Sequence, residues 1–354
     1  MNASSRRRKR ATAQVVGAAA TLAAVPALAA IAPLWATAAA TRLLPRITGR
    51  KPEATLTSQE ILQYSPEIGW KPRPHLDAYG GREDAVYHFT TDAEGWREAR
   101  TALDESDIVV FGDSFAFGRG VDDQELYSSW TNGAVTKGVG ADGYSMVHSA
   151  LWMERLQART AGSTVIWLVF LGNDLYDNLQ PGYRGRYRTP FVRLRDNGWE
   201  IATQHVSEGP FPFPVEANSS RTEIARLCTP GFYSDRALDA AGYLVERAQA
   251  ICASGGSPLH VLSVPHRSQI DRELLPRLKA SSPEPDYFDP HLPDKRLAGL
   301  CAALGVPFVP LSEHLEPHDY FARDVHWRPS GHQKVGSLLA ELHQAAAIRP
   351  SLQQ

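Results

Sequence analysis

The stretch that decides the fold is TVIWLVFL, residues 164–171. Its side chains are apolar or β-branched throughout, which is typical of a strand covered on both faces, because a strand with one wet face alternates apolar and polar residues. Three shorter runs have the same character: IVVF at 108–111, LHVLSV at 259–264 and PFVPL at 307–311. The sequence therefore predicts a buried sheet of several strands.

Helical patterns lie between these strands, over residues 145–161, 235–253, 294–304 and 331–347. Strands that alternate with helices predict a parallel sheet, since each helix carries the chain back to the starting edge. The expected fold class is α/β, a three-layer α/β/α sandwich of the flavodoxin-like kind over residues 106–345.

Two segments depart from this alternation. Residues 42–105 are polar and rich in Gly and Pro, and we expect an irregular extension packed on the main domain. Residues 180–233 form a loop-rich insertion. Within it, FVRLRDNGWEI at 191–201 alternates around Asn197-Gly198, which predicts a β-hairpin with a type I′ turn.

The N-terminal segment, residues 1–41, has the pattern of an export signal. The basic run RRRKR at 6–10 precedes residues 11–41, which contain no charged side chain. Two small-x-small triplets, Ala27-Leu28-Ala29 and Ala36-Thr37-Ala38, fit a cleavage site, while the length of the apolar segment fits a membrane anchor. We expect an exported protein, secreted or membrane-anchored, in the bacterial cell envelope or periplasm.

Composition excludes several classes of protein. The 37 basic and 39 acidic side chains nearly cancel, which argues against a nucleic-acid binder. The three cysteines, Cys228, Cys252 and Cys301, are too few and too far apart for a disulfide framework or a metal site. No cofactor is expected.

Polar residues whose side chains could take part in catalysis follow the predicted strands. GDSF at 112–115 comes after the first strand, GND at 172–174 after the second, and RDVHW at 323–327 after the last, while a glycine-rich loop, GVGADG, covers 138–143. Ligands of open α/β sheets bind outside the carboxyl ends of the strands. A hydroxyl, an amide, backbone donors, an imidazole and a carboxylate gathered there are the groups that acyl transfer needs.

These blocks resemble those of the SGNH/GDSL hydrolases, the GDSL-like lipases and acylhydrolases of bacterial envelopes, over about residues 106–345. The resemblance implies a nucleophile at Ser114 within FGDSF and an oxyanion-hole asparagine at Asn173. It also implies an oxyanion-hole glycine within GADGY, for which Gly143 is the better match and Gly140 the alternative. The Ser114 backbone N–H would complete the oxyanion hole.

The last block implies His326 as the base and Asp324 as the acid that orients it. Many members of the family place the acid three residues before the histidine. Here Arg323 holds that position and the spacing is two residues, so the orienting group is either Asp324 or a backbone carbonyl.

The implied reaction transfers an acyl group from an ester to Ser114 and then to an acceptor. Water as acceptor gives a serine esterase, for which an O-acetylated carbohydrate is a candidate substrate; a glycan hydroxyl gives an O-acyltransferase. The alternative from another class is a non-catalytic envelope binding protein with the same fold.

Two rival motifs match the sequence less well. Gly138-x-Gly140-x-x-Gly143 matches the dinucleotide fingerprint, but residues 131–137 are too polar for the strand that this motif requires. Gly112-x-Ser114-x-Ala116 lacks the second glycine of the α/β-hydrolase elbow.

Five histidine and aspartate residues near the C-terminal end of the predicted domain are candidate metal ligands. His314 and His318 lie in a polar loop, however, so they make no helical i, i+4 pair, and no metal is expected from them together with Asp319, Asp324 and His326.

Overall fold

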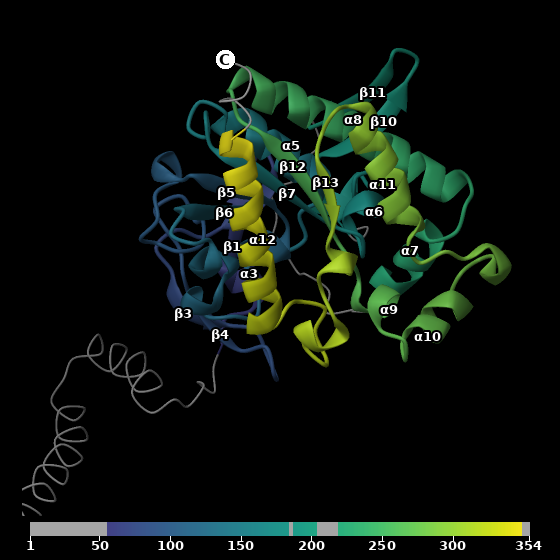
Figure 1. The fold of residues 1–354 in the computed structure, drawn as a ribbon, viewed down its shortest axis with the longest axis horizontal. Coiled ribbons are helices and arrows are strands. Elements are labelled where there is room, and N and C mark those ends of the chain that lie inside the picture. Colours follow the sequence, from purple (N-terminus) through teal and green to yellow (C-terminus); the bar gives the residue numbers. More distant parts are fainter. Residues whose placement is uncertain (1–54, 184–186, 204–218, 349–354) are drawn as a thin grey trace, which may run out of the picture. The chain divides into compact units, whose positions relative to one another are not determined.

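The centre of the molecule is a five-stranded sheet, all of whose neighbouring strands are parallel (Figure 1). The computed structural model describes residues 55–183, 187–203 and 219–348. The strands of the sheet are β5 (Ile108–Gly112), β6 (Thr136–Gly140), β7 (Thr164–Phe170), β12 (Leu259–Val264) and β13 (Phe308–Pro310). Their spatial order, β13-β12-β7-β5-β6, is doubly wound, and the winding reverses between β5 and β7. The predicted α/β sandwich is confirmed.

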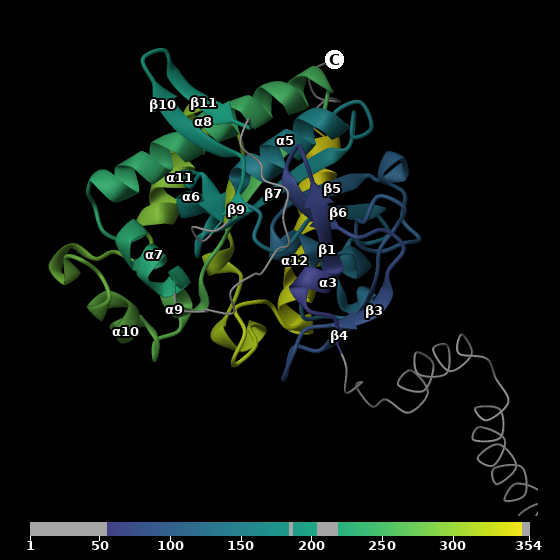
Figure 2. The ribbon, with the colours of Figure 1, turned by 180° about the vertical axis from the view of Figure 1, so that it is seen from behind.

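Four long helices complete the layers, at the positions that the sequence predicts. They are α5 (Met146–Leu156), α8 (Phe232–Ser254), α11 (Leu292–Ala303) and α12 (Pro329–Ile348). Alternate side chains of β5 enter two cores: Val109 and Phe111 pack with α5, α8 and α11, while Ile108 and Val110 pack with α12. Helix α12 lies in front of the sheet in Figure 1 and behind it in Figure 2. Burial on both faces explains the uninterrupted apolar runs.

Short helices and hairpins surround the sandwich. The short helices are α3 (Ser58–Ile61), α4 (Ser114–Phe117), α6 (Asp174–Asp177), α7 (Ser219–Leu227), α9 (Arg267–Ile270) and α10 (Leu275–Ala280). The antiparallel hairpins are β1 (Leu62–Ser65) with β2 (Gly69–Pro72), β3 (Asp77–Gly80) with β4 (Tyr87–Thr90), β8 (Gly182–Tyr183) with β9 (Tyr187–Arg188), and β10 (Phe191–Arg195) with β11 (Gly198–Ala202).

The first two hairpins lie beside the β6 edge of the sheet in both views (Figures 1 and 2). A buried ion pair joins the two parts: Lys137 of β6 has no exposed surface, and its Nζ lies 2.9 Å from Asp92 Oδ2 and donates to the Glu98 carbonyl at 2.8 Å. An unpaired buried ammonium would cost several kcal/mol, so this contact fixes residues 92–98 against the sheet.

Strand β6 corrects the sequence analysis, which placed residues 138–143 in a loop and judged the preceding residues too polar for a strand. Gly138 and Gly140 lie inside the strand because helix α4 packs directly on it. A Cβ at Gly138 would lie 2.6 Å from the Ala116 carbonyl oxygen, and one at Gly140 would lie 2.5 Å from the Asp113 carbonyl oxygen. Glycine is needed at these two positions because another segment of backbone packs against the strand, and not because a phosphate binds there.

The hairpin predicted at 191–201 is confirmed, but its turn is not type I′. That turn needs positive φ at both central residues. Neither Asp196 nor Asn197 has a positive φ, whereas Gly198 has φ +108°. The left-handed residue follows the two-residue loop, as in a type I turn that ends in a glycine bulge.

The expected export segment, residues 1–41, lies outside the described ranges. Within those ranges, no helix combines the length and the apolar character that crossing a membrane requires.

Candidate active site

Ser114 stands at the switch point of the sheet, where ligands of doubly wound folds bind. Strand β5 ends at Gly112, and Ser114 is the first residue of α4. Asp113 caps this helix, since its Oδ1 accepts the Phe115 backbone N–H at 2.9 Å. The capping role of Asp113 and the placement of Ser114 are therefore parts of one turn. Ser114 is buried, with 8% of its surface exposed.

His326 meets Ser114 across the carboxyl edge of the sheet. The His326 Nε2 lies 2.7 Å from Ser114 Oγ, although the residues are 212 positions apart. Asp324 Oδ1 bonds the other ring nitrogen, Nδ1. Because a carboxylate only accepts hydrogen bonds, Nδ1 carries the proton, and Nε2 is left to accept from the Ser114 hydroxyl. Three of the predicted site residues are thus joined in one chain of hydrogen bonds.

The short spacing between Asp324 and His326 is accommodated by a bend. Asp324 Oδ1 accepts the backbone N–H of His326 at 3.0 Å in addition to the ring Nδ1–H. One oxygen therefore fixes both the main chain and the ring of His326.

Charge keeps Asp324 ionised. Burial raises the pKa of this carboxyl, but the charge and hydrogen bond of His326 and the Arg119 guanidinium outweigh burial and hold the pKa well below its usual range. An ionised acceptor favours the imidazolium that forms when His326 takes a proton.

The backbone N–H groups of Ser114 and Gly143 are both without a hydrogen-bond acceptor among the residues that the structure describes. Gly143 has φ +75° and lies in the turn between β6 and α5. Gly140, in contrast, belongs to the β6 ladder opposite Gly112. An N–H that pairs with no other residue can receive an anion, which agrees with the expected preference for Gly143 over Gly140, and the oxyanion-hole role of Ser114 and Gly143 stays a prediction.

Asn173 lies just beyond the end of β7, which neighbours β5. Its Nδ2 donates to Asp177 Oδ2 at 2.9 Å and to Asp174 Oδ1 at 3.3 Å. Carboxylates accept only, so they fix which end of the amide is the NH₂ group. These contacts hold the amide at the turn after β7, and the catalytic role of Asn173 stays a prediction.

Sequence reasoning missed the buried acids beneath the nucleophile. Burial raises the pKa of Asp113 to about 6 and raises the pKa of Asp174 well above its usual range, an effect that the negative charge of Asp113 increases. Asp174 Oδ2 accepts the Phe170 backbone N–H at 2.9 Å, so this acid also closes the turn after β7. Both acids belong to the sequence blocks quoted above, GDSF and GND, and their place in those blocks could have identified them as part of the site.

Sequence reasoning also missed Phe115, whose ring packs against His326. The centroid of Phe115 lies 4.9 Å from that of His326 and 4.8 Å from that of Trp327. Phe115 is buried, so it limits the rotation of the imidazole.

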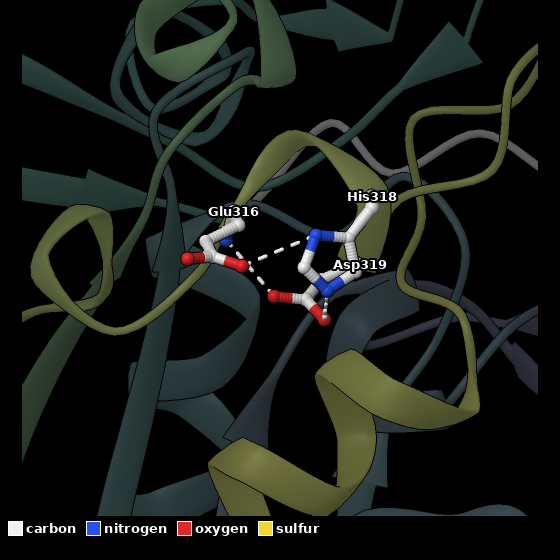
Figure 3. A group of neighbouring side chains, drawn as sticks. All are labelled: Glu316, His318 and Asp319. Carbon is white, nitrogen blue, oxygen red and sulfur yellow. Dashed lines mark hydrogen bonds and ion pairs between the residues drawn. The ribbon is translucent and has the colours of Figure 1, made fainter.

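The acidic cluster behind the His326 loop consists of Glu316, His318 and Asp319 (Figure 3). His318 Nδ1 lies 3.1 Å from Glu316 Oε2, and its Nε2 lies 3.6 Å from Asp319 Oδ1. A lysine already supplies the cation: Lys334 Nζ donates to Asp319 Oδ2 at 2.7 Å. This cluster is accounted for as an ion-pair network that anchors α12, and His314 is not part of it.

No protein-family model matches the sequence, and no curated protein matches it. Among solved structures, the chain is similar to an inhibitor-bound aryl esterase of M. smegmatis, with 13% identity, 68% of this chain and 98% of that chain covered, and a TM-score of 0.40. A GDSL-like lipase from Bacteroides thetaiotaomicron shows 12% identity, coverage of 70% and 93%, and a TM-score of 0.39. A carbohydrate acetylesterase family member from Sinorhizobium meliloti shows 12% identity, coverage of 68% and 98%, and a TM-score of 0.39. Similarity at this level assigns no activity to the chain.

Proposed function

We propose that the protein is a serine esterase that forms an acyl-enzyme at Ser114. The observation that carries this proposal is the chain of hydrogen bonds from Asp324 through His326 to Ser114 Oγ. A serine hydroxyl is a weak nucleophile until a base takes its proton, and a base is effective when a third group fixes its tautomer.

In the first half-reaction, Ser114 Oγ attacks the ester carbonyl while His326 Nε2 takes the hydroxyl proton. Asp324 stabilises the resulting imidazolium. The carbonyl oxygen becomes negative and receives hydrogen bonds from the N–H groups of Ser114 and Gly143. The Asn173 amide adds a third when one of its two N–H groups exchanges its carboxylate acceptor, Asp174 or Asp177, for the oxyanion. His326 then returns the proton to the departing alkoxide, which leaves as the alcohol.

The second half-reaction repeats these steps with a new nucleophile. Water gives the carboxylic acid and regenerates Ser114, whereas a glycan hydroxyl gives a new ester. Both acceptors use the same residues, so O-acyl transfer is the alternative within this mechanism. A non-catalytic binding protein would not need a base at 2.7 Å from the serine hydroxyl.

The basic run and the apolar segment of residues 1–41 support an envelope location, secreted or anchored in the membrane. An O-acylated carbohydrate is the substrate class that this location favours.

A substrate panel tests the proposal. Short- and long-chain p-nitrophenyl esters and acetylated sugars are offered with and without a glycan acceptor, to the wild type and to Ser114→Ala. We expect turnover in the wild type alone. Turnover by Ser114→Ala at more than a few per cent of the wild-type rate would exclude Ser114 as the nucleophile.

A further inference from the structure

The peptide between Asp142 and Gly143 is held from outside the sandwich. The Trp70 Nε1–H donates to the Asp142 carbonyl oxygen at 2.8 Å. Trp70 belongs to β2, 72 residues earlier in the chain, and has no exposed surface. Figures 1 and 2 both place the hairpin β1–β2 and helix α3 beside the β6 edge of the sheet.

The carboxylate of Asp142 is held as well. Ser58 Oγ donates to Asp142 Oδ2 at 2.7 Å, and the Arg119 guanidinium pairs with the same oxygen. Arg119 also donates to Ser58 Oγ at 3.3 Å. Asp142 is therefore fixed at its carbonyl and at its side chain, which leaves its peptide little freedom to rotate.

Trp70 is itself tied back to the sandwich. The buried Tyr144 hydroxyl donates to the Trp70 carbonyl oxygen at 2.7 Å, and Trp152 Nε1–H donates to the Tyr144 hydroxyl at 3.1 Å. The indole donor thus has a defined position relative to α5 and to the turn that contains Gly143.

This arrangement sets the direction of one backbone donor. In a planar trans peptide, the C=O of Asp142 and the N–H of Gly143 point to opposite sides. Trp70 fixes the carbonyl and so fixes the N–H. Without that bond, the peptide could rotate, because glycine at φ +75° offers little steric resistance to other backbone conformations.

We propose that Trp70 is a positioning residue that aims the Gly143 N–H at the oxyanion, with Ser58 and Arg119 supporting it through the Asp142 carboxylate. The inference rests on the proposed function. It makes the N-terminal extension part of the catalytic unit. The position of Arg119 agrees with this, since its charge also helps to keep the pKa of Asp324 low.

The test compares Trp70→Phe with Trp96→Phe. Trp96 is a matched control: it is also a buried tryptophan of the extension, but its Nε1 has no hydrogen-bond partner among the described residues. Both variants lose an indole of similar burial, and only Trp70→Phe loses a donor to Asp142. The readouts are kcat and KM with p-nitrophenyl acetate, and Ki for a trifluoromethyl ketone, which forms a tetrahedral adduct with an oxyanion.

We expect Trp70→Phe to lower kcat by about 10- to 100-fold, less than the 10²–10³ of a deleted oxyanion donor, because the N–H is misdirected and not removed. KM should stay within about twofold and Ki should rise in parallel with the fall in kcat. Trp96→Phe should change none of the three by more than about twofold. If Trp70→Phe does not fold, Ser58→Ala should show the same pattern with a smaller fall in kcat.

Equal kcat values for Trp70→Phe and Trp96→Phe would overturn the inference, as would a rise in KM with kcat unchanged. When Trp70→Phe does not fold, a Ser58→Ala variant with wild-type kcat and Ki would do the same. In these cases the wild type still turns over the ester, so the proposed function stands. A wild type without turnover would refute the proposed function and the inference with it.

Discussion

Replacing Asp324 by Asn isolates the charge of the orienting acid. Asp324 Oδ1 accepts both the backbone N–H and the ring Nδ1–H of His326. An amide oxygen in the same place can accept both, so Asp324→Asn should keep the correct tautomer of His326 and lose only the negative charge. This differs from a triad in which the amide presents its NH₂ group to the ring.

The magnitude follows from electrostatics. A charge about 4 Å from the imidazolium contributes about 4 kcal/mol at the effective dielectric constant of a partly buried site, or roughly 10³ in rate. A retained neutral hydrogen bond recovers part of this, and we expect kcat to fall by about 10²–10³. Asp324→Ala also leaves two donors unpaired, which adds about 1–3 kcal/mol and should lower kcat by about 5- to 150-fold further.

The assay is steady-state hydrolysis of p-nitrophenyl acetate, with melting curves to confirm folding. Asp84→Asn is the control, because exposed Asp84 accepts the Ala322 backbone N–H at 3.3 Å in the same loop without contacting His326. It should keep wild-type kcat. If Asp324→Asn is no more active than Asp324→Ala, the claim that one oxygen of residue 324 accepts both N–H groups of His326 is wrong. If Asp324→Asn loses less than about tenfold, Ser114 and His326 act as a dyad.

Three other perturbations have defined outcomes. Asn173→Ala should lower kcat by about 10²–10³ with KM nearly constant, the result of losing one oxyanion donor; a variant that fails to fold would instead assign Asn173 to the turn. Burial raises the pKa of Glu98 from 4.5 to about 7, so its carboxyl contributes stability below pH 4.5 that is lost as pH rises to about 7. Glu98→Gln should remove that loss, on the order of 2–3 kcal/mol, and a melting-temperature profile from pH 4 to 8 with the same slope in both proteins would contradict this. Residues 1–50 fused to a reporter that is active only outside the cytoplasm should give signal, and a silent fusion would remove the export hypothesis.

The parts of the fold that the sequence predicts are those in which local pattern and global position agree. Residues 164–171 read as a buried strand because both faces of β7 are covered. Strand β6 was missed because its identity depends on contacts distant in sequence. Lys137 can be buried there because Asp92 and the Glu98 carbonyl oxygen pair with its ammonium. Gly138 is needed there because the Tyr127 hydroxyl and the Ala116 carbonyl oxygen leave no room for a Cβ.

The candidate site divides in the same way. Ser114, His326 and Asp324 belong to short motifs, and the order of the strands brings those motifs together. The bond from Trp70 to Asp142 carries no local signal, because it depends on where the extension packs. The direction of the Asp324 oxygen depends on the bend of its loop, which residue spacing alone does not define.

The most direct test of the central claim is the site of covalent modification by a fluorophosphonate. Intact-mass measurement of the wild type should show one adduct, and peptide mapping should place it on Ser114 because His326 Nε2 lies 2.7 Å from the Ser114 hydroxyl. His326→Ala should react at least about 10²-fold more slowly, since the serine loses its base. A wild type that stays unmodified, or an adduct that persists in Ser114→Ala, would contradict the assignment of Ser114 as an activated nucleophile.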